Sequence, residues 1–262
     1  MQLKYLQTLL EPSTSGISKI SAMAFSPDNM RLAVCHERTI WLFDEQGEKR
    51  DKFSTKPMDS KYGKKSYVVT ALAFSPDSTR LAIGQSDKIV FVYKIGAEWG
   101  DKKSICNKFI VNSAVTALVW PQEGGIYFGV AEGKVRIANT RTNKSSTVYN
   151  VNSYTVTLVA NTQGSGILSS HADGQLVRYV LSENEVHPSE VNGKVLVHKC
   201  PATALAWTPN GYFCAGADRK VVVYGKNGKE TQRFDYKNEE KDFTIATVSP
   251  SGQSVVIGSF NR

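Results

Sequence analysis

The stretch that decides the fold is VTALAFSPDSTRLAIGQSDKIVFVY, residues Val69–Tyr93. Its runs of β-branched, aromatic and alternating apolar residues predict three short strands, at Val69–Phe74, Leu81–Gly84 and Ile89–Tyr93. The segment between the first two, Ser75-Pro76-Asp77-Ser78, predicts a turn, because proline fixes φ and Asp and Ser bond their own backbone. A lone sheet of this size is marginal in water, so it needs neighbours.

Copies of this stretch recur along the whole chain. The positions equivalent to Phe74 lie 41 to 49 residues apart. These anchors are Phe25, Phe74, Trp120, Asn161, Trp207 and Val248. A period of roughly 40–50 residues with about four strands per unit is typical of β-propeller blades and not of helical repeats. We therefore predict an all-β propeller of five complete blades and a truncated sixth, as a partial or open ring, within one domain spanning residues 1–262.

The other strands of each unit repeat as well. Weaker outer fourth strands are expected near 51–54, 105–110, 145–149, 194–198 and 231–236. Asp173-Gly174 is the strongest hairpin signal, and we expect a two-residue turn there with positive φ at both positions. The aromatic anchors should be largely buried between blades, and these are Phe25, Phe74, Trp120 and Trp207.

These repeats resemble the WD-repeat family of β-propellers. That family ends its third strand in an aromatic residue plus Asp, and Phe43-Asp44 comes close to this pattern here. The sequences of loops and edge strands are more specific. At 50–57, 93–103 and 138–147 they are similar to the amino-terminal propeller of the intraflagellar transport protein 172 family. The resemblance covers the chain from Met1 to Arg262. Members of that family carry two amino-terminal propellers and then a helical solenoid, and no solenoid is expected in these 262 residues.

The resemblance implies a function without catalysis. It implies an interaction scaffold, a subunit of the intraflagellar transport complex B train required for cilium assembly. It further implies partners among the other complex B subunits, one of them with a calponin-homology domain, and an anionic membrane contact. The implied locations are the cilium or flagellum, the basal body and the cytoplasm.

Composition narrows the class of protein. The chain carries a net charge of +8 and has no run of about 18 apolar residues, no secretory leader and no lipidation motif, so we expect a soluble intracellular protein. Its four cysteines lack close spacing, which favours free thiols in a reducing compartment. They are Cys35, Cys106, Cys200 and Cys214.

Sites for metals, cofactors and catalysis are not predicted. The histidines are scattered, without Cys-x-x-Cys or His-x-x-x-His spacing, so neither a metal site nor a cofactor is expected. His171 with Asp173 suggests catalysis, but a hairpin turn with a structural Asp is the favoured interpretation. The glycine pairs open no helix with Lys-Ser/Thr behind it, so no phosphate cradle is predicted.

One basic segment is the candidate partner-binding site. Residues 48–65 hold seven basic against three acidic side chains, and Lys102-Lys103 lies at the matching position one blade later. An anionic partner is one interpretation, and a solvated loop is the other. The candidate residues are Lys56, Lys61, Tyr62, Lys64, Lys65, Lys102 and Lys103.

A nucleic-acid-binding or coat-type propeller that uses this basic loop is the alternative function. RNA binding needs exposed aromatic side chains for base stacking, and Tyr62 and Tyr67 could serve. Nothing else favours nucleic acid, so it is not the expected partner. A propeller enzyme is the least favoured class, because the first strands carry Ala, Thr and Val where carboxylates or metal ligands would have to converge.

The chain ends raise the question of closure. Leu3–Leu10 has the alternation of a strand but no partner within its own unit, and the sequence stops where a third strand of the sixth unit should begin. We expect that these residues do not close a complete propeller. Either Leu3–Leu10 pairs with the last unit, or an edge stays open and recruits a strand.

Overall fold

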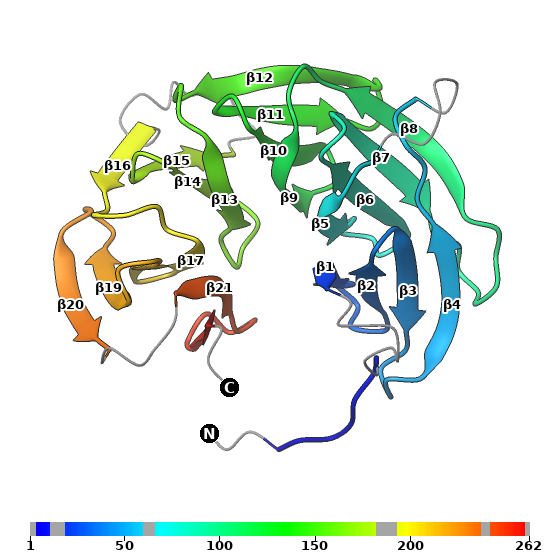
Figure 1. The fold of residues 1–262 in the computed structure, drawn as a ribbon, viewed down its shortest axis with the longest axis horizontal. Coiled ribbons are helices and arrows are strands. Elements are labelled where there is room, and N and C mark those ends of the chain that lie inside the picture. The colour runs from blue at the N-terminus through cyan, green and yellow to red at the C-terminus, as the bar shows by residue number, and fades with distance from the viewer. Residues whose placement is uncertain (1–3, 11–18, 60–65, 182–192, 237–241, 260–262) are drawn as a thin grey trace. The chain divides into compact units, whose positions relative to one another are not determined.

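The protein is described here in a computed structural model, over residues 4–10, 19–59, 66–181, 193–236 and 242–259. Its described regular structure consists of strands, which form five four-stranded antiparallel sheets and one two-stranded sheet (Figure 1). This confirms the predicted all-β fold with five complete blades and a truncated sixth. No helix that could cross a membrane occurs in the described residues. The chain divides into two compact units, Met1–Val115 and Thr116–Arg262, and each is considered by itself.

The first unit contains two blades, each a meander in which every strand pairs with the next. Blade 1 comprises β1 (Ile20–Phe25), β2 (Leu32–His36), β3 (Thr39–Phe43) and β4 (Lys49–Ser54). Blade 2 comprises β5 (Val69–Phe74), β6 (Arg80–Gln85), β7 (Ile89–Lys94) and β8 (Ser104–Ile110).

The second unit contains the remaining blades, with β9 starting at the last residue of the first unit. Blade 3 comprises β9 (Val115–Gln122), β10 (Gly125–Val130), β11 (Lys134–Asn139) and β12 (Lys144–Asn150). Blade 4 comprises β13 (Thr155–Ala160), β14 (Gly166–His171), β15 (Gln175–Val180) and β16 (Gly193–Val197). Blade 5 comprises β17 (Ala204–Thr208), β18 (Gly211–Ala215), β19 (Lys220–Gly225) and β20 (Glu230–Asp235). The two-stranded sheet comprises β21 (Phe243–Val248) and β22 (Val255–Ser259).

The core of the first unit lies between its two blades. Small residues on one face of β1, Ala22 and Ala24, pack against the buried cluster that includes Leu72 and Phe74 of β5. Alternation along the strand makes this fit, because residues two apart point to the same face of a sheet. The cluster continues into β2, β3, β6 and β7.

The predicted burial of the anchor aromatics holds for Phe74 and Trp120, which are 4% and 7% exposed, and Trp207 is half-buried. The prediction is wrong for Phe25, which is 66% exposed. Phe25 points to the face of β1 opposite Ala22 and Ala24. Within the described part of the first unit, no strand packs on that face of β1, so the repeat position alone does not bury its aromatic side chain.

The amino-terminal segment is not the predicted strand. Its described residues, 4–10, have no strand structure, and Leu3 lies outside the described residues. Leu9 and Leu10 instead pack on a cluster of Leu32, Val34 and Phe43 in blade 1. The side-chain amide of Gln7 donates to the carbonyl oxygen of Gln46 at 2.8 Å. An alternating apolar pattern can thus be satisfied by packing on a sheet without ladder pairing, while ring closure stays a prediction.

The turn at Asp173-Gly174 also differs from expectation. It is a three-residue loop, Ala172–Gly174, closed by the Gly174 N–H donating to the His171 carbonyl at 2.9 Å. Gly174 has a φ of +82°, whereas Asp173 keeps an ordinary negative φ. This is the type I turn with a left-handed third residue that three-residue hairpins adopt, and it needs positive φ at only one position.

Candidate functional site

The turns that follow β1 and β5 fold in the same way. In blade 1 the Ser26 hydroxyl donates to Asp28 at 2.5 Å and accepts from the backbone N–H of Arg31 at 2.9 Å. The same bonds recur in blade 2 around Ser75. The side chains of these Ser-Pro-Asp turns therefore form hydrogen bonds with the backbone of their own turn, as the sequence predicts. They also fix the position where Arg31 leaves blade 1.

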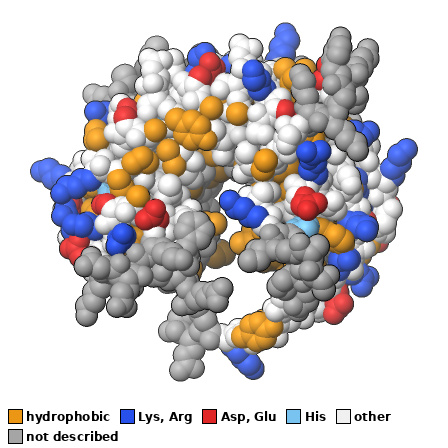
Figure 2. Space-filling view, in the orientation of Figure 1, with side chains coloured by type: hydrophobic (Ala, Val, Ile, Leu, Met, Phe, Trp, Pro, Cys, Tyr) orange, Lys and Arg blue, Asp and Glu red, His pale blue; other side chains and the backbone are white. Residues whose placement is uncertain are grey.

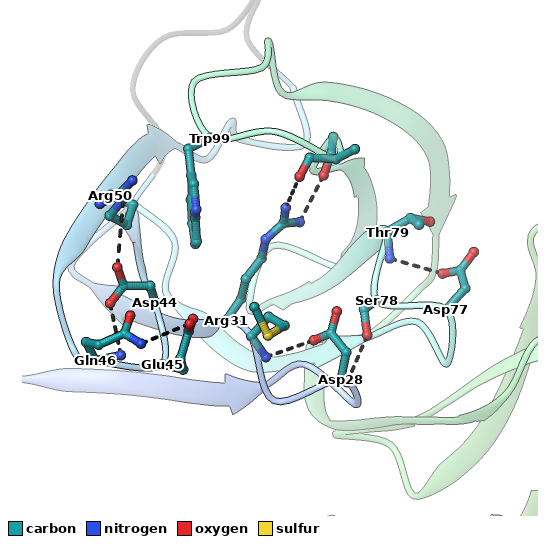
Figure 3. Close-up of a pocket in the computed structure, with 13 residues that line it drawn as sticks. Asp28, Arg31, Asp44, Glu45, Gln46, Arg50, Asp77, Ser78, Thr79 and Trp99 are labelled. Carbon is teal, nitrogen blue, oxygen red and sulfur yellow. Dashed lines mark hydrogen bonds and ion pairs between the residues drawn. The ribbon is translucent and has the colours of Figure 1, made fainter.

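A pocket of about 460 Å³ opens beside the first of these turns (Figure 3). Its lining includes four carboxylates and two guanidinium groups. The acidic residues are Asp28, Asp44, Glu45 and Asp77, and the basic ones are Arg31 and Arg50. Because carboxylates outnumber guanidiniums, the pocket suits a cationic group, such as a lysine or arginine side chain of a partner.

The two arginines flank one aromatic ring in this pocket. Arg31 lies 5.0 Å and Arg50 5.9 Å from the centre of the Trp99 ring, both within cation–π range. The Arg31 guanidinium also donates to the Gly96 carbonyl at 2.9 Å and to that of Ala97. Arg50 lies 3.8 Å from Asp44. The guanidiniums are thus committed to contacts within the chain, and Arg31 ties the loop after β7 to blade 1.

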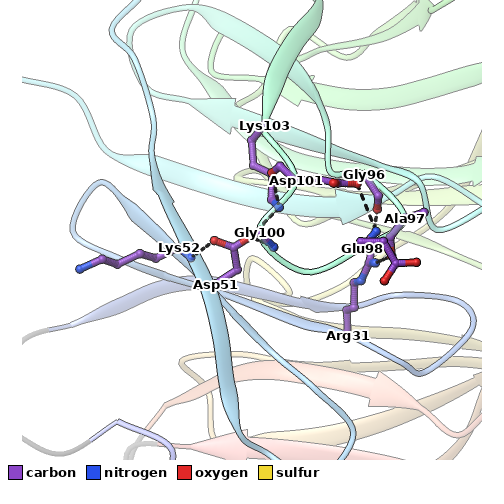
Figure 4. Close-up of polar contacts among 9 residues, drawn as sticks. All are labelled: Arg31, Asp51, Lys52, Gly96, Ala97, Glu98, Gly100, Asp101 and Lys103. Carbon is purple, nitrogen blue, oxygen red and sulfur yellow. Dashed lines mark hydrogen bonds and ion pairs between the residues drawn. The ribbon is translucent and has the colours of Figure 1, made fainter.

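A second anchor ties the same loop to β4 (Figure 4). The Lys103 ammonium lies 2.5 Å from the Asp51 carboxylate and donates to the Asp101 carbonyl at 2.6 Å. Asp51 also accepts from the backbone N–H groups of Gly100 and Lys52. Burial alone would raise the pKa of Asp51, but the bonds from Lys103 and the two N–H groups outweigh burial and hold that pKa below its usual range.

The predicted partner-binding residues fall into three groups. Lys56, after β4, and Lys102, before β8, are exposed. The Lys103 side chain is only 5% exposed and its charge is neutralised by Asp51. The other four candidates lie outside the described residues, namely Lys61, Tyr62, Lys64 and Lys65.

Tyr67, proposed as a stacking residue for RNA, is buried. Its hydroxyl bonds that of Thr55 at 2.9 Å, and the Arg38 guanidinium covers its ring at 4.6 Å. The expectation that Tyr67 offers an exposed stacking surface is therefore wrong. Basic side chains are interspersed with acidic ones on the visible face of the molecule (Figure 2).

Sequence reasoning missed the parts of the site that depend on distant residues. In the sequence Trp99 is one residue of the loop at 93–103, and its contact with Arg31 joins one blade to the next. The scattered histidines and widely spaced cysteines predict no metal site, and yet in the second unit ligand atoms of His198, Cys200 and Asp218 lie within 4.8 Å of one another. To find this cluster, a sequence-based prediction would have had to place the β18–β19 turn, which holds Asp218, beside the loop that holds His198 and Cys200.

Comparison with known proteins supports the blade structure of this chain. The family described as WD domain, G-beta repeat, matches residues 4–44, 55–94 and 191–225. The fold is that of a β-propeller, and the matched residues resemble WD repeats. Two solved structures share the fold at low sequence identity. A computationally designed protein, Ika8, is 21% identical with a TM-score of 0.65, and the match covers 92% of this chain and 68% of that one. A chain of the mitotic checkpoint complex is 17% identical with a TM-score of 0.71, and the match covers 92% of this chain and 70% of that one.

Relatives of higher identity are named as intraflagellar transport proteins. This propeller is 57% identical to the intraflagellar transport protein 172 homolog of Mus musculus, 41% identical to the intraflagellar transport protein osm-1 of Caenorhabditis elegans and 42% identical to intraflagellar transport protein 172 of Chlamydomonas reinhardtii. Each match covers 100% of this chain and 15% of the relative. The propeller thus resembles the amino-terminal region of these proteins, as its loop sequences predict.

Proposed function

We propose that this propeller is a non-enzymatic interaction scaffold of the intraflagellar transport train, acting in complex B during cilium assembly. The observation that carries the proposal is the 57% identity to a relative named for that process, sustained over the whole chain. Rigid blades that present loops suit such a role, because binding residues on loops need a fixed scaffold. The proposed location is the cilium or flagellum, with the basal body and cytoplasm as sites of assembly.

Replacement of the matching region in a relative tests this function. The region of the Chlamydomonas reinhardtii protein that aligns with residues 1–262 is exchanged for this chain, in a strain without the native protein. We expect flagella to be restored to near normal length. A hybrid protein that accumulates normally but leaves the strain without flagella contradicts the proposal.

We further propose that two kinds of contact hold the partner subunit. Exposed Lys56 and Lys102, with the basic residues at 61–65, meet acidic groups of the partner or an anionic membrane. The carboxylate-rich pocket beside Trp99 receives a basic side chain from the same partner. Opposite charges on neighbouring surfaces speed association and fix its orientation more than they add affinity. A partner with a calponin-homology domain remains the subunit we would examine first.

Charge variants of the hybrid protein test these contacts. Lys56→Glu with Lys102→Glu should reduce recovery of the other train proteins with the hybrid, and more strongly at low than at high salt, since exposed charges are screened. Glu45→Gln tests the pocket in the same way. Unchanged recovery at low salt in both variants contradicts the proposed contacts.

Lys103→Met is the matched comparison, because it removes a neighbouring charge that is already paired. It should lower the free energy of unfolding by about 2 kcal/mol through the loss of a charged hydrogen bond to Asp51. Lys102→Met should change that free energy by less than about 0.5 kcal/mol, as expected for an exposed side chain. Urea unfolding of the isolated chain measures both.

A further inference from the structure

Three potential metal ligands meet where blade 4 passes into blade 5. His198 directly follows β16, Cys200 lies two residues later in the loop to β17, and Asp218 lies in the turn between β18 and β19. One nitrogen of His198, the Cys200 sulfur and an Asp218 carboxylate oxygen all lie within 4.8 Å of one another. Small movements of the loop and the turn would bring these atoms to the distances that separate the ligand atoms of one metal ion.

His198 supplies the second observation. Its side chain is only 2% exposed, and its Nε2 has no hydrogen-bond partner among the described residues. Its other nitrogen, Nδ1, lies 2.8 Å from the Tyr224 hydroxyl, and the two rings meet edge to face. Since buried nitrogens are almost always bonded, Nε2 calls for a ligand.

Tyr224 is placed as a positioning residue for that ligand. When Nδ1–H donates to the Tyr224 oxygen, the lone pair of His198 is on Nε2. Histidines that bind metals usually donate their other N–H to such a partner, which fixes the tautomer and the ring orientation. The hydrogen bond to Tyr224 therefore leaves the lone pair of Nε2 available to a metal ion.

Glycine at position 216 brings the loop and the turn together. A Cβ atom built on Gly216 would lie 2.4 Å from the Pro201 carbonyl oxygen and 3.0 Å from the Cys200 sulfur. The first of these distances is too short for any side chain. The loop that carries Cys200 can therefore lie over the β18–β19 turn only because this residue is glycine.

We propose that His198, Cys200 and Asp218 form a Zn²⁺ site, with the fourth position open to water or to a partner's side chain. An imidazole nitrogen, a thiolate and a carboxylate are all ligands that zinc accepts, whereas Ca²⁺ and Mg²⁺ select oxygen alone. Binding releases the thiol proton of Cys200 to solvent, and no electron is transferred. The ion would cross-link the loop after β16 to the hairpin of blade 5.

Zinc titration of the metal-stripped 262-residue chain, against a chromophoric chelator, tests the site. We expect one tightly bound Zn²⁺ per chain and at least tenfold weaker binding for Cys200→Ser and for Asp218→Asn. Tyr224→Phe should weaken binding about 10–100-fold, as loss of such supporting partners does. Cys106→Ser is the matched control, because Cys106 is exposed and lies outside the cluster. It should bind zinc as the unaltered chain does.

Two further readouts separate binding at this site from weak binding elsewhere. Co²⁺ in place of zinc should give a thiolate charge-transfer absorption that Cys200→Ser abolishes. Zinc should also protect Cys200 from alkylation while Cys106 reacts at the same rate, a test that needs no variant and so does not depend on refolding. An unaltered chain that binds no zinc, Cys200→Ser binding as tightly as the unaltered chain, or Cys200 alkylated equally with and without zinc would each overturn the proposal.

Discussion

At Gly174 the absence of a side chain lets the β14–β15 turn approach the backbone at the end of β16. Its φ is +82°, and a Cβ atom there would lie 2.2 Å from the His198 carbonyl oxygen. Gly174→Ala should therefore cost at least about 1–2 kcal/mol of unfolding free energy, since an L residue is strained in the left-handed region and the carbonyl must also move. The midpoint of urea unfolding measures this cost.

Gly124→Ala is the control for that prediction. Gly124 has no positive φ, and no atom lies within 4 Å of its built Cβ. Alanine there should be neutral or slightly stabilising, because it restricts the unfolded chain. Equal costs for the two substitutions would contradict the described turn geometry.

Phe25 and Phe74 occupy equivalent places in two strands but different environments. Phe74→Ala should cost about 3–5 kcal/mol, because it removes an aromatic side chain from the core between β1 and β5. Phe25→Ala should change the unfolding free energy by no more than about 0.5 kcal/mol, since its ring is exposed. Chemical unfolding of both variants checks this, and comparable losses would mean that Phe25 is covered in solution.

The loop after β7 shows how an irregular segment gains a fixed place. Arg31 and Lys103 bind it to blade 1 from two sides, through carbonyl oxygens and through Asp51. Neither bond joins near neighbours in the chain, as Arg31 and Gly96 are 65 positions apart. The loop and blade 1 therefore act as one surface, to which Trp99 contributes.

Acid should destabilise the molecule in two steps. Burial lowers the pKa of His171, which is neutral between the Ser153 carbonyl and the Ser169 hydroxyl, and burial likewise lowers that of His198. A histidine with a lowered folded pKa stabilises fully above its unfolded pKa, so stability should begin to fall below about pH 6.5. Thermal unfolding in buffers of constant ionic strength with a chelator present measures this step. A flat profile from pH 7 to 5 would contradict it.

The second loss of stability, at lower pH, comes from the protonation of carboxylates. Burial alone would raise the pKa of Asp28, Asp51 and Asp77, but hydrogen bonds to each carboxylate outweigh burial and lower the pKa. Their contribution is present above the unfolded pKa, about 3.9, and is lost as pH falls from there through their folded values. The melting temperature should therefore drop more steeply below about pH 4 than between pH 6 and 5.

Blade number and strand positions were predictable because each strand carries its own signal, such as the alternation in Val69–Phe74 and the turn chemistry of Asp77. Features set by neighbours were not. The exposure of Phe25 depends on what packs against β1, and the Leu9 and Leu10 contacts depend on an open sheet face. At the candidate site, sequence marked the basic residues, but it could not show that Lys103 is already paired or that Trp99 meets Arg31.

Trp99 also makes the pocket optically observable. Its indole lies between two fixed positive charges, and fields of that kind shift the energy of the excited state. A cationic side chain that enters the pocket would change this field, so the emission of the chain should change colour on docking even without a dye. Trp99→Phe would supply the blank, since the remaining tryptophans, Trp41, Trp120 and Trp207, do not line this pocket.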